Sequence, residues 1–462
     1  LACPAGIVDP FDTSNVAAAT AWTSTSAAPV SPAPTLVTGE AGVIPSALSI
    51  AGQGGGELAG LSAVGCAAPR TSQWIATGAT TSGADIVLLL SNPGPTASVV
   101  SVDGFGASGR LNTAPRQVTV PAGSTASVLL AGWFPDESAL AVHVQADGGG
   151  VAAWAQASLM NGEIPQGTTL ASASVPAASH TILGIDPRGT SLLRLVSPSG
   201  DARVRVWVAD SSGVHPLPGG EATVAEGTTL DMPLDGASND STPIALLVTA
   251  DQDVVAHATT ITLGAPWAER ASAWIMRANA TPTTSLTEAA IPGRKQLQDA
   301  ATSVLSSAPI RDTSLATESG VTAVRAHLLL YVPAQATGSA PQQQSPAPQS
   351  GTPTPTPTPD IWSSPSPTQP QSDPAQDPQS SGTSSSTPGA VAVRVGERTV
   401  YVAPGIPTLV EAPDAAGRIL AQSPIHAAIV VSADTAVGTM STTWNVGTEG
   451  ISAVTGDIRL TN

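Results

Sequence analysis

Three long stretches of the chain repeat one order of β-type segments and turns, and this repetition constrains the fold more than any single motif does. The copies begin near Ile86, Ser191 and His327. Each opens with an apolar run (IVLLLSN, SLLRLVS or HLLLYV) and closes with two alternating runs that meet near an Ala-Asp pair. The three pairs are Ala146-Asp147, Ala250-Asp251 and Ala433-Asp434. We therefore expect each copy to fold as the same unit, with the Ala-Asp pair in a turn.

Valines at every second position mark the strands of these copies, as at Val204, Val206 and Val208. Alternation of this kind indicates half-buried strands, and Pro or Gly separates the runs at intervals of about 8 to 12 residues. The only helix that we expect is a short one around Arg294 to Leu305. The sequence therefore predicts an all-β chain of three tandem antiparallel β-sandwiches with an immunoglobulin-like architecture.

The repeats also predict the domain boundaries. We expect an N-terminal segment, residues 1–69, to pack on a first sandwich at 70–186, followed by sandwiches at 187–293 and 294–462. Residues 334–388 interrupt the third copy at a hairpin, are rich in Pro, Ser and Thr, and contain no basic residue. Such a segment buries too little apolar surface to offset its ordering entropy, so we predict a disordered, partly polyproline loop. Its Ser-Pro and Thr-Pro runs also resemble O-glycosylated stalks.

Cys3 and Cys66 are the only two cysteines. An even count in a lysine-poor, Ser/Thr-rich chain predicts one disulfide formed outside the cytosol. The chain begins at Leu1 rather than Met, so we expect an upstream secretion signal or membrane anchor to have preceded it. Leu1-Ala2-Cys3 could instead be the remnant of a lipoprotein processing site, but the leucine lies one position too close to the cysteine.

The charge balance argues against one class of function, and the lack of long apolar runs argues against another. The chain has 17 basic and 34 acidic residues, a net charge of −17, and Lys295 as its single lysine. A protein that tracks nucleic-acid phosphates needs the opposite balance. No run approaches the roughly 18 apolar residues of a membrane-spanning helix. Only 11% of residues are charged, against about 25% in typical domains, so the surface must be mostly Ser, Thr, Ala, Gly and Pro.

Motifs for cofactors and metals are absent or have a simpler explanation. Gly104 to Gly109 match G-x-G-x-x-G, but a strand follows where a dinucleotide site needs a helix, so we interpret them as a β-turn. Asp251 and Asp253 could offer oxygens to Ca²⁺, but we favour a polar hairpin turn, because the other two copies lack the second acid and a calcium site needs about six to eight oxygens. The six histidines show no metal-ligand spacing, and we interpret His143 and His257 as ordinary strand residues. A Ser-His-Asp set assembled only in three dimensions stays open.

The aromatic residues divide into core candidates and ligand-contact candidates. Trp154, Trp207 and Trp274 lie in or beside strands and are expected in the cores. Trp133 and Phe134 follow a strand in a connection, where exposed rings could stack on a sugar or a partner. The alternative is that this connection folds an aromatic ring over the edge of the sandwich. Trp362 in the Pro-rich insert is a third candidate for ligand contact.

Several phrases of the chain resemble a known group of proteins. They are Cys3-Pro4, Cys66-Ala67-Ala68-Pro69, Trp74, and the runs LLLSNPGPTASVVSVDGFGASGR, VTVPAG and ALAVHVQADGGGVAA. These phrases are similar to uncharacterised secreted proteins of high-GC actinobacteria that carry a domain of unknown function. The resemblance covers nearly the whole chain except the insert. It implies export and a place at the cell envelope, and it offers no catalytic residues.

Three functions follow as hypotheses. The first is an exported, non-enzymatic scaffold or interaction protein of the actinobacterial envelope, without a cofactor or metal. The second is a module that binds envelope glycans. The third is a hydrolase whose site forms between domains. The repeats and the absence of a catalytic motif favour the first, with an envelope protein or glycan as the expected partner.

Overall fold

The computed structural model describes the chain except residues 18, 24–26, 31–34, 39–46, 77, 113, 163, 267–272, 312–319, 335–388, 448–458 and 462. The side chains of 27–30, 35–38, 161, 264–266, 273–277 and 459–461 are also outside the description. The regular secondary structure of the described residues is almost entirely antiparallel strand, which confirms the all-β class. The predicted Pro-rich loop lies outside the described residues. No helix in the described part is both long and apolar enough to cross a bilayer.

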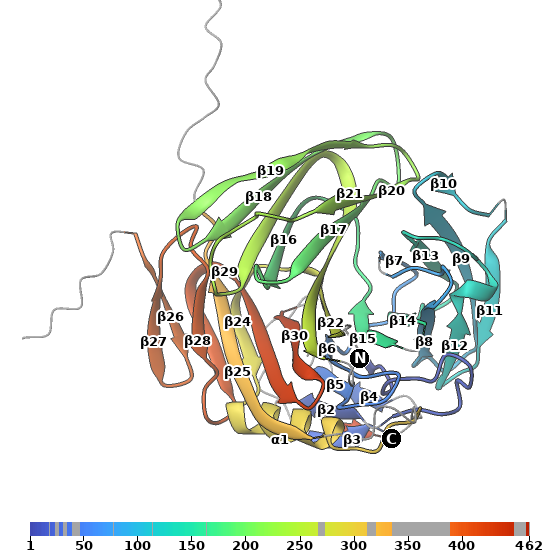
Figure 1. Ribbon diagram of the computed structural model, residues 1–462, viewed down its shortest axis with the longest axis horizontal. Helices are drawn as coiled ribbons and strands as arrows, with labels where there is room; N and C mark the ends of the chain where they lie inside the picture. The colour runs from blue at the N-terminus through green and yellow to red at the C-terminus, as the bar shows by residue number, and fades with distance from the viewer. Residues whose placement is uncertain are drawn as a thin grey trace, which may run out of the picture.

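Four antiparallel sheets radiate from a common centre like the blades of a propeller (Figure 1). Blade I contains β3 (Ala27–Val30), β2 (Ala19–Thr23), β5 (Ala47–Gln53) and β6 (Gly60–Gly65). Blade II contains β12 (Ser124–Leu129), β8 (Ala84–Asn92), β14 (Ala152–Asn161) and β15 (Ile164–Ser172). Blade III contains β20 (Thr229–Pro233), β17 (Thr190–Val196), the second half of β21 (Ile244–Pro266) and β22 (Ala273–Ala280). Blade IV contains β28 (Thr408–Glu411), β25 (Val321–Tyr331), the second half of β29 (Gly417–Thr435) and β30 (Gly438–Val446).

The innermost strand of every blade is the last in chain order, and these four strands close a ring. β6 contacts β15, β15 contacts β22, β22 contacts β30, and β30 contacts β6. Glycine permits one of these approaches, because a Cβ atom on Gly60 would lie 2.0 Å from the carbonyl oxygen of Thr168. At this point of the ring, β6 and β15 therefore approach backbone to backbone, without a side chain between them.

Each blade carries an outer sheet, and the blade and its outer sheet together form a unit. Unit II adds β7 (Ser72–Ile75), β9 (Ser98–Gly106), β10 (Gly109–Arg110), β11 (Arg116–Val120) and β13 (Ala141–Ala146). Unit III adds β16 (Ala177–Ile185), β18 (Ala202–Asp210), β19 (Gly213–Val224), β23 (Pro282–Thr283) and the first half of β21. Unit IV adds β24 (Leu286–Ile291), β26 (Val391–Val395), β27 (Arg398–Val402) and the first half of β29. Unit I adds β1 (Ala2–Cys3), β4 (Thr35–Thr38) and β31 (Arg459–Thr461).

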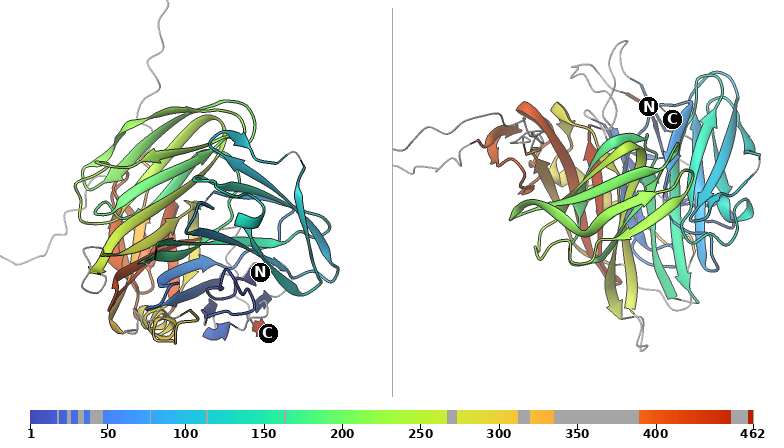
Figure 2. Two further views of the ribbon diagram at one scale, coloured as in Figure 1. Left: turned by 45° about the vertical axis from the view of Figure 1, so that its right-hand side comes forward. Right: turned by 90° about the horizontal axis from the view of Figure 1, so that it is seen from above.

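Unit I is a fourth copy of the repeat, which the sequence prediction of three copies missed. β1 pairs with β4 as β7 pairs with β13 and β16 with β21. Residues 24–26 alone separate β2 from β3, so unit I lacks the hairpin that β9 opens in unit II. The C-terminal strand β31 pairs with β4 as β9 pairs with β13, and so fills the vacant place. Accordingly, the two ends of the chain lie near each other (Figures 1 and 2).

The Ala-Asp pairs do not all mark the same point, which corrects the sequence alignment of the third copy. Asp147 lies where the chain passes from the outer sheet to blade II, and Asp251 lies at the same crossing in unit III. Asp251 is in continuous strand β21, so the expected hairpin turn there is wrong. In unit IV the crossing falls between Ile425 and His426, and Asp434 instead lies at the end of β29, beside the turn to β30.

Alternating valines of the outer sheets and leucines of the blades fill the sandwich cores. In unit III, Val204, Val206 and Val208 pack with Leu193 and Leu195. The predicted helix is confirmed as α1 (Arg294–Leu305), which buries Leu297, Ala301 and Val304 against blades I and IV. Apolar burial of this kind is the main source of stability.

The tryptophans predicted in the cores have different environments. Trp154 is 1% exposed and packs where blades I and II meet, which confirms it as a core residue. Trp207 is 37% exposed, so the prediction for it is wrong. It lies on β18, where Val206 and Val208 have the inward positions of the alternation. The side chain of Trp274 lies outside the described residues.

Candidate functional site

The C-terminal ends of three inner strands surround a pocket on the axis of the ring, which we call the axial pocket. Gly65 ends β6, Ser172 ends β15, and Thr281 follows β22; all three line a cavity of about 370 Å³. This volume falls in the lower part of the range for small-molecule sites. The other polar side chains of its lining are Arg70, Gln73, Ser174, Ser179, His180, Thr283 and Thr284. Among the described residues of the lining, six carry hydroxyl groups and none carries a carboxylate.

A narrow cavity of about 20 Å³ adjoins the axial pocket and shares Gly65, Ser172 and Thr281 with it. Trp444 and Asn445 of β30 also line this cavity, so all four blades contribute to it. Both side chains are at least nine-tenths buried, yet Trp444 Nε1 and Asn445 Oδ1 have no hydrogen-bond partner among the described residues. Buried polar atoms are rarely left without a partner unless a water or ligand completes them.

Side-chain hydrogen bonds join each blade to the next around the axis. They run from Leu170 N to Ser62 Oγ (2.8 Å), from Asn279 Nδ2 to Leu170 O (3.4 Å), from Asn445 Nδ2 to Thr281 O (2.6 Å), and from Ala63 N to Thr442 Oγ1 (2.8 Å). Since these bonds link all four inner strands, the pocket walls are held by one network rather than by mobile loops.

The electrostatics of the axial pocket favour a neutral ligand. Arg70 is the one formally charged side chain among the described lining residues, and it already interacts with another group of the protein. Burial lowers the pKa of His180, whose Nε2 lies 2.6 Å from the carbonyl oxygen of Val254, so this imidazole is neutral at pH 7. The pocket therefore offers mainly hydroxyl and amide groups, which suit a neutral molecule.

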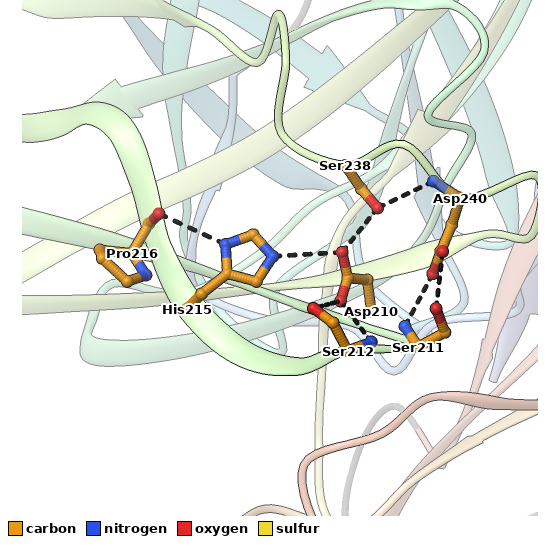
Figure 3. A network of polar contacts seen from close by, with 7 residues as sticks. All are labelled: Asp210, Ser211, Ser212, His215, Pro216, Ser238 and Asp240. Carbon is orange, nitrogen blue, oxygen red and sulfur yellow. Dashed lines mark hydrogen bonds and ion pairs between the residues drawn. The ribbon is translucent and has the colours of Figure 1, made fainter.

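A second polar cluster, around Asp210, stabilises the turn between β18 and β19 through side-chain hydrogen bonds (Figure 3). The carboxylate of Asp210 accepts hydrogen bonds from Ser212 N (2.8 Å), Ser212 Oγ (2.6 Å) and Ser238 Oγ (2.7 Å), and lies 3.1 Å from His215 Nε2. Burial alone would raise the pKa of Asp210, but these hydrogen bonds lower it well below its usual range. Both serines bond to the carboxylate rather than to the imidazole, so the order Ser-His-Asp of a hydrolytic triad is not formed here.

The outer sheet of unit II brings a serine and a histidine together. Ser72 Oγ lies 2.8 Å from Nε2 of His143, whose ring stacks on Trp74 at 4.4 Å. Asp103 is the cross-strand neighbour of His143 on β9. Its carboxylate accepts hydrogen bonds from Arg110 at 2.6 Å and Asn112 at 3.1 Å, and in the described structure no hydrogen bond joins it to His143. The pair therefore lacks the acid that would orient its base.

Arg194 holds the seam between units II and III. Its guanidinium forms two 2.7 Å bonds to the carboxylate of Asp231 and donates to the carbonyl oxygens of Gly78 (2.5 Å) and Leu140 (3.1 Å) in unit II. His257 is its cross-strand neighbour, and burial lowers the pKa of His257 to about 4. With its donors engaged by backbone and carboxylate oxygens, Arg194 is a structural link between units.

Two of the three candidate residues for ligand contact lie together in unit II. Phe134 follows the 3₁₀ turn η1 (Leu130–Gly132), is 2% exposed, and packs over Gly104 in the core of unit II. Trp133 is half-buried and packs edge-on against Phe134. Neither of them lines the axial pocket. Trp362, the third candidate, lies outside the described residues.

Other predictions from the sequence have clear outcomes. Cys3 and Cys66 form the predicted disulfide. Gly106 and Gly109 pair across the turn between β9 and β10, which confirms a turn rather than a dinucleotide site. His143 and His257 lie in strands, as expected. Among the described residues no group of three His, Cys, Asp or Glu side chains could hold a metal ion.

Sequence reasoning missed the axial pocket because its residues carry no motif. Ser172, Ser179 and Thr281 are ordinary residues at strand ends, and Gly65 lies more than a hundred positions from Ser172. Their one common feature is position: each follows or ends the last strand of a copy, or opens the next copy. That feature becomes visible only once the N-terminal segment is identified as a fourth copy.

Comparison with known protein families matches residues 19–340 to a family of unknown function (DUF5719). The chain belongs to this family. The DUF5719 match begins at β2 and extends past β25, so it includes blades I to III and the first strand of blade IV. No curated protein and no solved structure matches the chain. Membership of DUF5719 assigns no activity, so the function must be argued from the structure.

Proposed function

We propose that this protein is a non-enzymatic scaffold or interaction protein that acts outside the cytoplasm, at the envelope of an actinobacterial cell. The observation that carries the proposal is the axial pocket with its adjoining cavity, where the four blades of the chain meet. The described lining presents hydroxyl and amide groups and no carboxylate that could act as a general base. Its histidine, His180, is bonded to a backbone carbonyl. The arrangement suits recognition of a partner molecule better than chemical turnover.

The extracytoplasmic location rests on the disulfide and on the sequence resemblance. The Cys3–Cys66 bond joins β1 to the end of β6, and such bonds persist in oxidising compartments. A net charge of −17 keeps the chain soluble and away from anionic surfaces that attract polybasic proteins. A neutral envelope partner agrees with this charge and with the lining of the axial pocket.

The test combines capture with an activity screen. The oxidised chain, immobilised on beads, should retain one or a few envelope components, and soluble chain in excess should compete for them. In parallel, the wild-type chain and His143→Ala should hydrolyse ester, peptide and glycoside reporters equally poorly. Hydrolysis that disappears in His143→Ala would overturn the non-enzymatic assignment, since Ser72 and His143 form the one serine-histidine contact of the described structure.

Recognition of envelope glycan is a second candidate function, and the hydroxyl-rich lining of the axial pocket favours it. Ser and Thr hydroxyls donate and accept hydrogen bonds, as sugar hydroxyls do. This candidate places the contact at the axis of the ring rather than at Trp133, Phe134 or Trp362.

A further inference from the structure

We propose that the axial pocket is a binding site for a single sugar residue, with one sugar hydroxyl inserted into the narrow cavity at the meeting point of the four blades. This inference rests on the second candidate function above and gives it a location and a binding geometry. It is independent of which envelope component the protein contacts elsewhere.

The size and shape of the two cavities support this occupant. The axial pocket, at about 370 Å³, is large enough for one sugar ring with its hydration, and the adjoining cavity, at about 20 Å³, accommodates about one water-sized group. Because the cavities share Gly65, Ser172 and Thr281, a ring in the wider space can extend one hydroxyl into the narrower one.

The unpartnered side-chain oxygen of Asn445 requires a hydrogen-bond donor. Asn445 Oδ1 is an acceptor without a donor among the described residues, although Nδ2 of the same amide donates to Thr281 O at 2.6 Å. Trp444 precedes it on β30, so its ring points to the opposite face of the strand, where it packs edge-on against Trp22. A sugar hydroxyl can donate to Asn445 Oδ1, whereas a carboxylate lacks the donor.

The rest of the lining is amphipathic in the way that a sugar ring is. Ser172, Ser174 and Ser179 provide hydroxyls, and Val175 and Pro282 provide apolar surface for the C–H face of a ring. A cation would find no carboxylate among the described lining residues, and a divalent metal would lack acidic ligands. A long acyl chain would leave the hydroxyls of the lining without partners.

Ligand-observed NMR with three probes tests the proposal: glucose, N-acetylglucosamine and glucuronic acid, each at millimolar concentration with the full oxidised chain. We expect saturation transfer to at least one probe. Ser179→Trp, which fills the pocket from an exposed position on β16, should weaken that binding at least about tenfold. Thr119→Trp is the matched control, because Thr119 is an exposed strand hydroxyl on β11 outside the pocket lining.

A second variant guards against loss of folding in Ser179→Trp. Ser172→Ala combined with Ser179→Ala removes two hydroxyls without adding bulk, and should weaken binding while leaving the thermal midpoint near that of the wild type. Absence of saturation transfer to all three probes would overturn the proposal. So would equal binding by the wild type, Ser179→Trp and the double alanine variant. Neither result would affect capture of envelope components by another surface, so the scaffold assignment is tested separately.

Discussion

Units I and II share a four-stranded blade and a row of three paired strands in the outer sheet, but these are assembled from the chain in different ways. The outer sheet of unit II comes from one continuous stretch, β7 to β13. The outer sheet of unit I combines β1 at the N-terminus, β4, and β31 at the C-terminus. Unit I also carries the disulfide, between Cys3 and Cys66, which unit II does without. Completing the outer sheet of unit I therefore depends on pairing between β4, near the N-terminus, and β31, near the C-terminus.

This difference has a thermodynamic meaning. Bringing distant segments together costs loop-closure entropy that a local hairpin does not pay to the same extent. Unit I is also shorter and rich in alanine, with Ala19, Ala21, Ala47 and Ala51 in its core where unit II has leucine and valine. Smaller side chains bury less apolar surface. In unit I, the Cys3–Cys66 disulfide and the pairing of β31 with β4 compensate for the smaller apolar surface that its side chains bury.

The largest expected effect comes from removing the disulfide. The paired substitution Cys3→Ser and Cys66→Ser should lower the free energy of unfolding by about 4 kcal/mol, because it frees a loop with a sequence separation of 63 in the unfolded chain. Urea unfolding of the variant and of Ala67→Ser, a neighbouring control, measures this. Hydrogen exchange should accelerate first in β5 and β6 of unit I. Equal acceleration in β8 and β14 would contradict the view that unit I is the dependent part.

Acid should destabilise the units that contain buried histidines rather than unit I, which has no histidine. Burial lowers the pKa of both His257 in unit III and His426 in unit IV to about 4. Between pH 6.5 and 4 the unfolded chain binds protons at these sites and the folded chain does not, so stability falls as the pH falls through this window. The loss is up to about 3 kcal/mol for each histidine.

Urea midpoints at pH 7 and pH 4.5 measure this loss. His257→Asn should remove part of the difference between the two pH values, since one of the buried histidines with a lowered pKa is then absent. An unchanged pH dependence in His257→Asn would show that the buried histidine of the seam between units II and III is not responsible. Hydrogen exchange at pH 4.5 should increase in β21 and β29 before it increases in β5.

The third prediction concerns β31, the C-terminal strand that completes the outer sheet of unit I. A chain that ends at Gly447 lacks β31 and loses the pairing of Arg459, Leu460 and Thr461 with β4. We expect a loss of about 2 kcal/mol, the net value of a few edge hydrogen bonds. Faster amide exchange in β4, with β13 and β18 unchanged, would locate the loss in unit I. A synthetic peptide of residues 456–462 should restore protection, and its failure to do so would argue that β31 contributes little to closure.

The sequence predicted the parts of this fold that depend on local pattern. Alternating valines identified the strands of units II to IV, a short helix was expected around the residues of α1, and the cysteine count identified the disulfide. It missed unit I, whose strands are short and alanine-rich and whose last strand is supplied from the far end of the chain. It missed the axial pocket for a related reason: Ser172 and Thr281 become neighbours only through ring closure. The exposure of Trp207 shows that a strand position alone does not decide which face a residue occupies.

The smallest effect tests which Ala-Asp pairs are structurally equivalent. Asp147 accepts a hydrogen bond from Val99 N at 2.7 Å, and Asp251 accepts one from Arg203 N at 2.7 Å, so each carboxylate holds the start of the neighbouring outer strand. Asp434 instead pairs with Arg325 at 2.7 Å and accepts from Thr439. Asp147→Ala and Asp251→Ala should each cost about 1 kcal/mol through the loss of a backbone partner. Asp434→Ala, at an exposed ion pair, should cost about 0.5 kcal/mol or less.

Thermal midpoints of the three variants at high and low salt separate these cases, because salt should change only the effect of Asp434→Ala. If all three variants behave alike, the carboxylates of Asp147 and Asp251 do not anchor the crossing between the two sheets, and the equivalence of units II and III at that point rests on strand order alone.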